Sequence, residues 1–363
     1  MKKMTINTNM GNVAVINLIN KNKYLDYDFF ADQTVMERVL AYSSKLPEIE
    51  QTCILLSKDE MIDSSLKKIV KEKWTEEDLF EVFSGFSNSY DNIFYFWGDY
   101  PLLDNELTDK MYGNHIKYYA GYTFADGFPL GFSPEILRSS DIPLLYQLSK
   151  GSKKDITRNT VFNILQKDIN AFDIETEISP IDLRMYRISL SCDNKRNSEL
   201  LKSFIKRGIV NTESLLDKIE DFAPLLRTKP AYYQIQITDS CPQLCSYCPF
   251  SKEAVSIEKR ESMTLENYKI ILDKIEEFSD DAHIALSAWG EPSLHEDFIS
   301  LVQETLEREN LTLIIETSGL GWSEEILRKI KDISTEYDKS VQWIVSLDAL
   351  DRDLYKKLRG DGY

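Results

Sequence analysis

The residues most able to do chemistry stand in one short stretch, where Cys241, Cys245 and Cys248 occur within eight positions. Spacings of four and three residues let all three thiolates of one loop point at a single centre. Thiolates are soft ligands that suit zinc or an iron–sulfur cluster. The chain has only five cysteines and no export signal, so we expect a metal site in a reducing, cytoplasmic compartment rather than a disulfide framework.

The number of ligands helps to choose between the two kinds of metal. A structural zinc ion normally takes four protein ligands, and no fourth ligand is evident near this loop. His283 and His295, the histidines of this half, show no paired metal-binding spacing. Three cysteines fit instead a [4Fe–4S] cluster that leaves one iron open. A zinc knuckle completed by a distant residue, or a chance grouping of cysteines, stays as the alternative.

A repeated strand–helix pattern is expected to position this loop. The predicted strands lie at residues 232–238, 283–287, 311–315 and 341–347. Amphipathic helical patterns follow them, and Thr264 and Ser323 are the expected N-caps of two of these helices. Four βα units in succession predict an open parallel sheet or a partial barrel over residues 231–363. Chemistry in such folds is found at the carboxyl ends of the strands.

Distinctive segments stand at those strand ends. Ser-Ala-Trp-Gly-Glu-Pro follows the second strand and contains Trp289, Gly290 and Glu291; Glu316 ends the third strand, and Ser346 ends the fourth. Together with the C-x3-C-x2-C loop, these segments resemble those of the radical SAM enzymes, over roughly residues 230–363.

The resemblance implies a [4Fe–4S] cluster on the three cysteines, with S-adenosyl-L-methionine bound at the open iron. One electron would then cleave the cofactor to a 5′-deoxyadenosyl radical, which abstracts hydrogen from a peptide or small-molecule substrate. An electron donor such as flavodoxin or ferredoxin is the implied partner. By position, the implied cofactor contacts are Trp289, Gly290 and Glu291 at the methionyl end, Tyr247 near the adenine, and Glu316 and Ser346 near the ribose or carboxylate.

Two departures from the family pattern are visible. Trp289 replaces the first glycine of the second-strand motif, which is a mild change if main-chain atoms make the contact. The family's barrel usually has six strands, whereas the chain ends at Tyr363, after the fourth predicted strand, so we expect a truncated form. Asp348 is expected to cap the following helix.

The first half predicts an α/β domain over residues 1–215, joined by a linker at 216–230 to the second half. The predicted elements are strands at 12–19, 51–57, 91–97 and 181–192, and helices at 34–46, 198–206 and 212–222. A capping box formed by Thr34 and Glu37 opens the helix at 34–46. The spacing of strands and helices favours parallel pairing with helices on both faces of the sheet.

Gly98-Asp99-Tyr100-Pro101, after a buried strand, is similar to nucleotidyltransferases, in which an aspartate at this strand end binds the metal of a nucleoside triphosphate. Their glycine-rich phosphate loop is missing after the first strand, so a degenerate domain is expected. The expected fold is therefore α/β: a doubly wound, Rossmann-like nucleotidyltransferase-like domain, then an incomplete radical SAM partial barrel. This layout resembles the spiro-SPASM proteins.

Two other functions stay open at this stage: a nucleotidyltransferase with an iron–sulfur accessory domain, and a non-catalytic cluster-binding protein. The net charge of −17 over 363 residues repels nucleic acid and anionic lipid, so neither is an expected partner. No run of about 18 apolar residues is present to span a membrane.

Overall fold

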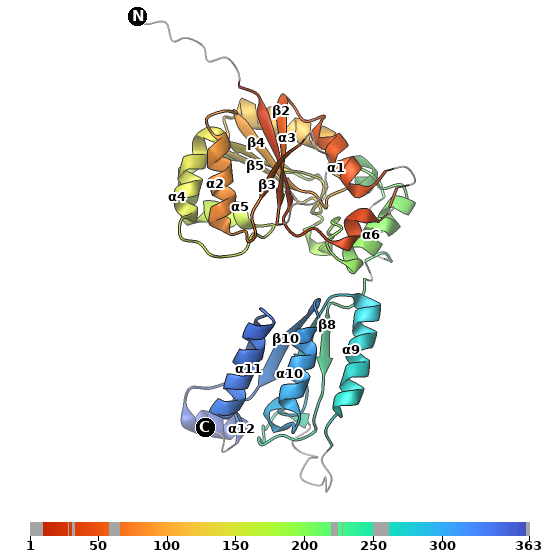
Figure 1. Cartoon of the computed structure of the whole chain (residues 1–363), viewed down its shortest axis with the longest axis vertical. Helices are drawn as coiled ribbons and strands as arrows, with labels where there is room; N and C mark the ends of the chain where they lie inside the picture. The colour runs from red at the N-terminus through yellow and green to blue at the C-terminus, as the bar shows by residue number, and fades with distance from the viewer. Residues whose placement is uncertain are drawn as a thin grey trace, which may run out of the picture. The chain divides into compact units, whose positions relative to one another are not determined.

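The computed structural model describes residues 10–27, 29–30, 33–57, 66–218, 224–226, 228–249 and 261–360. The chain divides into two compact units, Met1–Thr228 and Lys229–Tyr363. Both are built from strands and helices (Figure 1), which confirms the predicted α/β class.

The described residues of the N-terminal unit contain one sheet with the strand order β3-β2-β1-β4-β6-β5-β7. β1 pairs in parallel with both β2 and β4, whereas β6 runs antiparallel to β4 and β5. The sheet is therefore mixed rather than wholly parallel. The strands are β1 (Asn12–Leu18), β2 (Ile49–Leu56), β3 (Lys67–Val70), β4 (Asn92–Trp97), β5 (Tyr122–Asp126), β6 (Glu135–Arg138) and β7 (Ile174–Ile178).

Helices cover both faces of this sheet. Figure 1 shows α2, α4 and α5 on one side and α1 and α6 on the other. Val13 and Val15 of β1 pack on the first group of helices, and Ala14 and Ile16 pack on the second, so every residue of β1 is buried. The helices are α1 (Val35–Ser43), α2 (Glu76–Phe86), α3 (Asn105–Lys117), α4 (Ile142–Ser149), α5 (Thr160–Leu165), α6 (Lys195–Lys206) and α7 (Thr212–Leu216).

Several predicted features of this unit are present and one is wrong. The Thr34 side chain accepts from the Glu37 N–H, and the Glu37 carboxylate accepts from the Thr34 N–H, which confirms the capping box. The predicted strand at 181–192 is a short 3-10 turn followed by irregular chain. Its apolar side chains do pack on the core, but the Asp182 carboxylate accepts from the Arg184 N–H and starts a turn, and Arg187 has a φ of 51°.

The segment predicted as a linker, 216–230, contains Leu216, Leu225 and Leu226, which pack on the N-terminal core. The predicted helix at 212–222 begins as expected at Thr212 and is described as α7; residues 219–223 lie outside the described residues.

The C-terminal unit contains a parallel sheet with the order β11-β10-β9-β8 among its described residues. The predicted N-caps are confirmed, because Thr264 accepts from the Asn267 N–H and Ser323 accepts from the Ile326 N–H. The elements are β8 (Tyr232–Ile235), α9 (Leu265–Ser279), β9 (Ala282–Leu286), α10 (Phe298–Glu307), β10 (Leu311–Thr317), α11 (Glu324–Glu336), β11 (Val341–Val345) and α12 (Arg352–Arg359).

The two faces of this second sheet differ in chemistry. Alternate strand residues, among them Ile284 and Leu313, form an apolar core with α9, α10 and α11, which lie together on one face in Figure 1. The opposite face carries Tyr232, Gln234 and Glu316, which are linked by hydrogen bonds. A polar face beside the carboxyl ends of parallel strands is suited to binding a polar ligand. None of the helices in the described part of the chain is long and apolar enough to cross a membrane.

Candidate functional site

The three-cysteine loop follows β8 and is fastened to the last described helix, α12. The Ser246 N–H donates to the Leu358 carbonyl oxygen over 2.8 Å. Buried Gln243 donates to the Tyr355 hydroxyl over 2.7 Å and accepts from an Arg359 guanidinium nitrogen over 3.0 Å. The Cys245 sulfur lies 3.7 Å from the same Gln243 amide oxygen. The loop conformation is thus fixed from outside the loop, through its neighbours on α12.

Arg359 also joins the loop to the end of β11. Its side chain is buried, and its Nε donates to the Asp348 carboxylate over 2.6 Å. The Tyr247 hydroxyl donates to the same carboxylate oxygen. Asp348 was expected to cap the following helix, and this is wrong: Asp351 is the N-cap of α12 and accepts from the Leu354 N–H. Asp348 is instead the shared acceptor that holds Tyr247 and Arg359 together.

The thiols of Cys241, Cys245 and Cys248 are all half-buried. Burial raises the pKa of the Cys241 thiol, and Glu291 and the two other cysteines add repulsion, while a hydrogen bond from Gln243 opposes them. Burial also raises the pKa of the Cys245 thiol against the opposing charge of Arg359. Each of these two thiols therefore becomes a thiolate more readily when a metal compensates its charge.

Gly290 and Glu291 join the end of β9 to its neighbours. A Cβ on Gly290 would lie 2.0 Å from the Thr238 carbonyl oxygen, so only glycine lets the two backbones approach this closely. The Glu291 carboxylate is buried and accepts from the Thr317 hydroxyl over 2.5 Å. Its other oxygen accepts from the N–H and hydroxyl of Ser318, over 2.8 Å and 2.6 Å. Glu291 thus ties the ends of β9 and β10 with its side chain.

The remaining predicted cofactor contacts lie at the same edge of the sheet. Glu316 points to the polar face, where it accepts from the Tyr232 hydroxyl over 2.9 Å and from Gln234 over 3.3 Å. Ser346 donates its N–H to the Thr317 carbonyl oxygen, and its side chain is half-buried. Trp289 and Tyr247 are more than half exposed, at 57% and 55%. Both aromatic side chains are therefore accessible at the edge that carries the cysteine loop.

The donor chemistry of this edge fits an iron–sulfur cluster. The described residues hold no group of three or more His, Cys, Asp or Glu side chains gathered tightly enough for one metal ion. A cubane cluster places each thiolate on a different iron, so its ligands need not converge on one point. Three half-buried thiols on one anchored loop suit such a cluster. The two histidines of the unit are engaged in hydrogen bonds within the protein. His295 is buried between the Met263 carbonyl and the Asp297 N–H, and His283 bonds to Thr312.

Sequence reasoning missed the residues that hold the loop. Gln243 lies inside the cysteine motif and Arg359 inside the segment after the fourth strand, so their positions carried a signal. Their roles depend on a contact across 116 positions, and local spacing does not reveal such a contact.

The aspartate singled out in the N-terminal unit is already engaged. Asp99 is buried, and its two carboxylate oxygens accept from Arg158 over 3.1 Å and 2.6 Å. Arg158 also donates to Asp193 over 3.0 Å and packs over the rings of Trp97 and Tyr100. A nucleotidyltransferase would need this carboxylate to face a metal ion, whereas here an arginine of the same chain covers it.

One family model and two curated proteins match parts of the chain. Residues 235–363 match the family model of the Radical SAM superfamily. An uncharacterized protein of Treponema pallidum (strain Nichols) is 32% identical over 201 residues, which are 54% of this chain and 55% of that protein. A second Treponema pallidum protein is 31% identical over 58 residues, 16% of this chain and 26% of its own length. The chain thus spans about half the length of the first relative and about a quarter of the second.

Two solved structures are also similar. A cytidylyltransferase from Leptospira borgpetersenii serovar Hardjo-bovis (strain JB197) has 16% identity and a TM-score of 0.47, covering 61% of this chain and 98% of its own. A structure of BtrN in complex with AdoMet and 2-DOIA has 18% identity and a TM-score of 0.27, covering 34% and 59%. Both likenesses are distant and identify no activity. The family match, which begins within β8 and includes the cysteine loop and the later strand ends, makes residues 235–363 a radical SAM superfamily domain.

Proposed function

We propose that this chain is a radical SAM enzyme that holds a [4Fe–4S] cluster on Cys241, Cys245 and Cys248 and binds S-adenosyl-L-methionine beside it. The observation that carries the proposal is the anchored cysteine loop at the carboxyl end of β8, next to the close backbone approach at Gly290. When bound and reduced, these groups supply a 5′-deoxyadenosyl radical that abstracts hydrogen from a peptide or small-molecule substrate.

The chain's own residues would bind and orient the cofactor. Gly290 lets the backbone after β9 lie directly against Thr238, so that the end of β9 stays close to the segment that leads into the cysteine loop. Glu291 keeps that backbone in register with β10 through its bonds to Thr317 and Ser318. Glu316 and Ser346 would take the polar parts of the cofactor, and Tyr247 and Trp289 would exclude water from it. A flavodoxin or ferredoxin in the cytoplasm would supply the electron.

Anaerobic reconstitution with iron and sulfide tests the proposal. We expect about four iron atoms per chain and, after dithionite and S-adenosylmethionine are added, release of 5′-deoxyadenosine. Cys245→Ala should abolish both the visible absorbance of the cluster and the product. Cys53→Ala is the matched control, because Cys53 is a buried strand residue of the N-terminal unit and should leave both readings intact.

Two results would contradict the proposal. One is a single zinc ion per chain that survives anaerobic purification and excludes iron. The other is a full iron content with no 5′-deoxyadenosine, which would leave a cluster-binding protein without turnover. The nucleotidyltransferase alternative is not favoured, since Arg158 covers Asp99. It would be revived by pyrophosphate release that depends on Asp99.

A further inference from the structure

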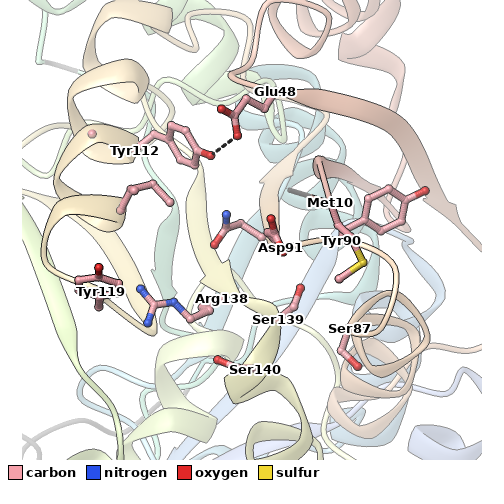
Figure 2. Close-up of a pocket in the computed structure, with 13 residues that line it drawn as sticks. Met10, Glu48, Ser87, Tyr90, Asp91, Tyr112, Tyr119, Arg138, Ser139 and Ser140 are labelled. Carbon is pink, nitrogen blue, oxygen red and sulfur yellow. Dashed lines mark hydrogen bonds between the residues drawn. The ribbon is translucent and has the colours of Figure 1, made fainter. Parts of the chain in front are cut away.

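A small cavity in the N-terminal unit has chemistry that the radical SAM proposal does not use. Its volume is about 250 Å³, and it lies at the carboxyl edge of the sheet, between the ends of β4 and β5, the start of β6 and the first turn of α5. A wider cavity of about 720 Å³ opens at the amino edge, where the Tyr112 hydroxyl donates to Glu48 (Figure 2). That wider cavity includes Arg138 beside its acidic groups, so it contains charges of both signs.

The walls of the small cavity are aromatic. Tyr122 stacks on Phe124 with ring centroids 5.4 Å apart, and Phe124 meets Phe162 at 6.1 Å. Tyr95 and Trp97 of β4 complete the lining from the other side. The Trp97 indole N–H is buried and has no hydrogen-bond partner among the described residues. A buried donor left unpaired is uncommon, and the hydroxyl oxygen of a small amino alcohol is a suitable acceptor for it.

One carboxylate in this cavity lacks a compensating charge. Glu135, the first residue of β6, is half-buried, and its Oε1 accepts from the Tyr122 hydroxyl over 2.5 Å. Within the described residues this is its only polar contact, and no cation pairs with it. Arg158 also lines the cavity, but its guanidinium is committed to Asp99 and Asp193. A partly enclosed carboxylate without a compensating positive charge is unfavourable, and a cation from outside would relieve that cost.

From this arrangement we propose that the cavity binds a small organic ammonium ion, with the charge facing Glu135 and the alkyl groups against the aromatic rings. Aromatic faces attract cations through their quadrupole, most strongly where water is excluded. The acidic side chains in and beside the cavity, Glu135, Asp99 and Asp193, outnumber the one arginine, which favours a cation over an anion. The volume admits a small amine and is too small for a nucleotide.

Choline and its uncharged isostere 3,3-dimethylbutan-1-ol test the charge separately from the shape. On the intact chain at about pH 8, calorimetry or ligand-observed NMR should show choline binding at least about tenfold more tightly than the alcohol. Glu135→Gln should remove the preference for choline. Glu106→Gln, an exposed residue of α3, is the control and should keep it.

Equal affinity of choline and the alcohol in the wild-type chain would overturn the proposal, because the cavity would then be a simple apolar pocket. Choline binding that survives Glu135→Gln unchanged would overturn it as well, as would no choline binding at millimolar concentration. The comparison of the two ligands needs no variant, so it stands even if a substituted chain folds poorly. Neither affinity, that of choline or that of the alcohol, depends on an iron–sulfur cluster, so this test can fail independently of the proposed function.

Discussion

The two units treat the carboxyl ends of their strands in opposite ways. At the end of β4, Asp99 is enclosed by Arg158, and the arginine is itself covered by the rings of Trp97 and Tyr100. After β8 a cation of the chain also approaches, but Arg359 is directed at Asp348 and Gln243, and the three thiols of the cysteine loop are half-buried. A chemically able residue at a strand end is therefore a good candidate for a site only where the fold does not enclose it in a buried ion pair.

The largest expected effect concerns the buried ion pair between Arg158 and Asp99, which follows β4. Arg158→Ala leaves Asp99 and Asp193 without their shared cation, and breaking a buried ion pair costs about 3–5 kcal/mol. We expect the urea midpoint of the N-terminal unit, followed by tryptophan fluorescence, to fall accordingly. Arg184→Ala is the control, because that arginine forms exposed ion pairs with Asp182 and Asp126 and should change the midpoint little. Equal midpoints for the two variants would mean that the ion pair of Arg158 with Asp99 stabilises the unit no more than an exposed ion pair does.

A smaller effect tests the close approach in the second unit. In Gly290→Ala the new Cβ meets the Thr238 backbone, which cannot move aside as a side chain could. We expect a loss of about 3 kcal/mol, at the upper end for overpacking, and lowered iron retention after reconstitution. Thermal unfolding and iron content per chain are the two measurements. A variant with wild-type stability and full iron would show that the backbones after β8 and β9 need not approach so closely.

The unpaired carboxylate of the N-terminal unit predicts a pH dependence. Burial raises the pKa of Glu135 from 4.5 to about 7, so between these values the unfolded chain binds fewer protons than the folded one. Stability should therefore fall as pH rises through this window, by about 1–3 kcal/mol, and level off above it. The other charged or titratable groups around the cavity are Tyr95, Asp99, Tyr100, Tyr122 and Arg158.

The difference between wild type and Glu135→Gln isolates this contribution, because the other groups are the same in both chains. The three tyrosines do not titrate in this window, because burial raises their pKa still further above its ordinary value of 10.0. Unfolding curves at about pH 4 and about pH 8 should show the variant gaining on the wild type as pH rises. A difference that stays constant with pH would show that Glu135 titrates normally.

The smallest effect has the opposite sign. Gly85 lies on the exposed side of α2, and a Cβ there would meet nothing within 4 Å. Gly85→Ala should raise the unfolding free energy by about 0.5–1 kcal/mol, because alanine loses less backbone entropy in a helix. Thermal unfolding of this variant beside Gly290→Ala compares a glycine that is replaceable with one that is required for the close approach. If both variants were destabilised, the effect of Gly290→Ala would reflect the loss of a glycine in general rather than the close approach to Thr238.

Much of the fold could be predicted from local sequence patterns. The caps at Thr34, Thr264 and Ser323 were visible as short motifs, and the four strands of the second unit followed from their apolar runs. Short strands such as β3 and β6 were missed, since four residues give too little periodicity to detect. The segment at 181–192 alternated like a strand, but Asp182 turned the backbone before a ladder could form.

The candidate site, too, was predictable only where its signals are local in the sequence. The three cysteines and the residues after β9 were identifiable because their spacing is local. The partners of those residues are distant in sequence, as with Glu291 and Ser318 or Asp99 and Arg158. The charge and hydrogen-bonding capacity of a side chain follow from its residue type, but its partner depends on tertiary packing. The pairing of Asp99 with Arg158 therefore could not be predicted from the sequence.

The fastening of the cysteine loop to α12 has a consequence for the order of assembly. Gln243 and Ser246 make their contacts with residues 112 to 116 positions later. All three cysteines thus emerge from the ribosome long before Arg359 is synthesised, and until then nothing on α12 can set the shape of their loop. Nascent chains halted before Arg352 would contain all three thiols but none of the α12 residues that hold their loop. If the loop binds a cluster as proposed, we therefore expect stable iron uptake only after α12 has been synthesised.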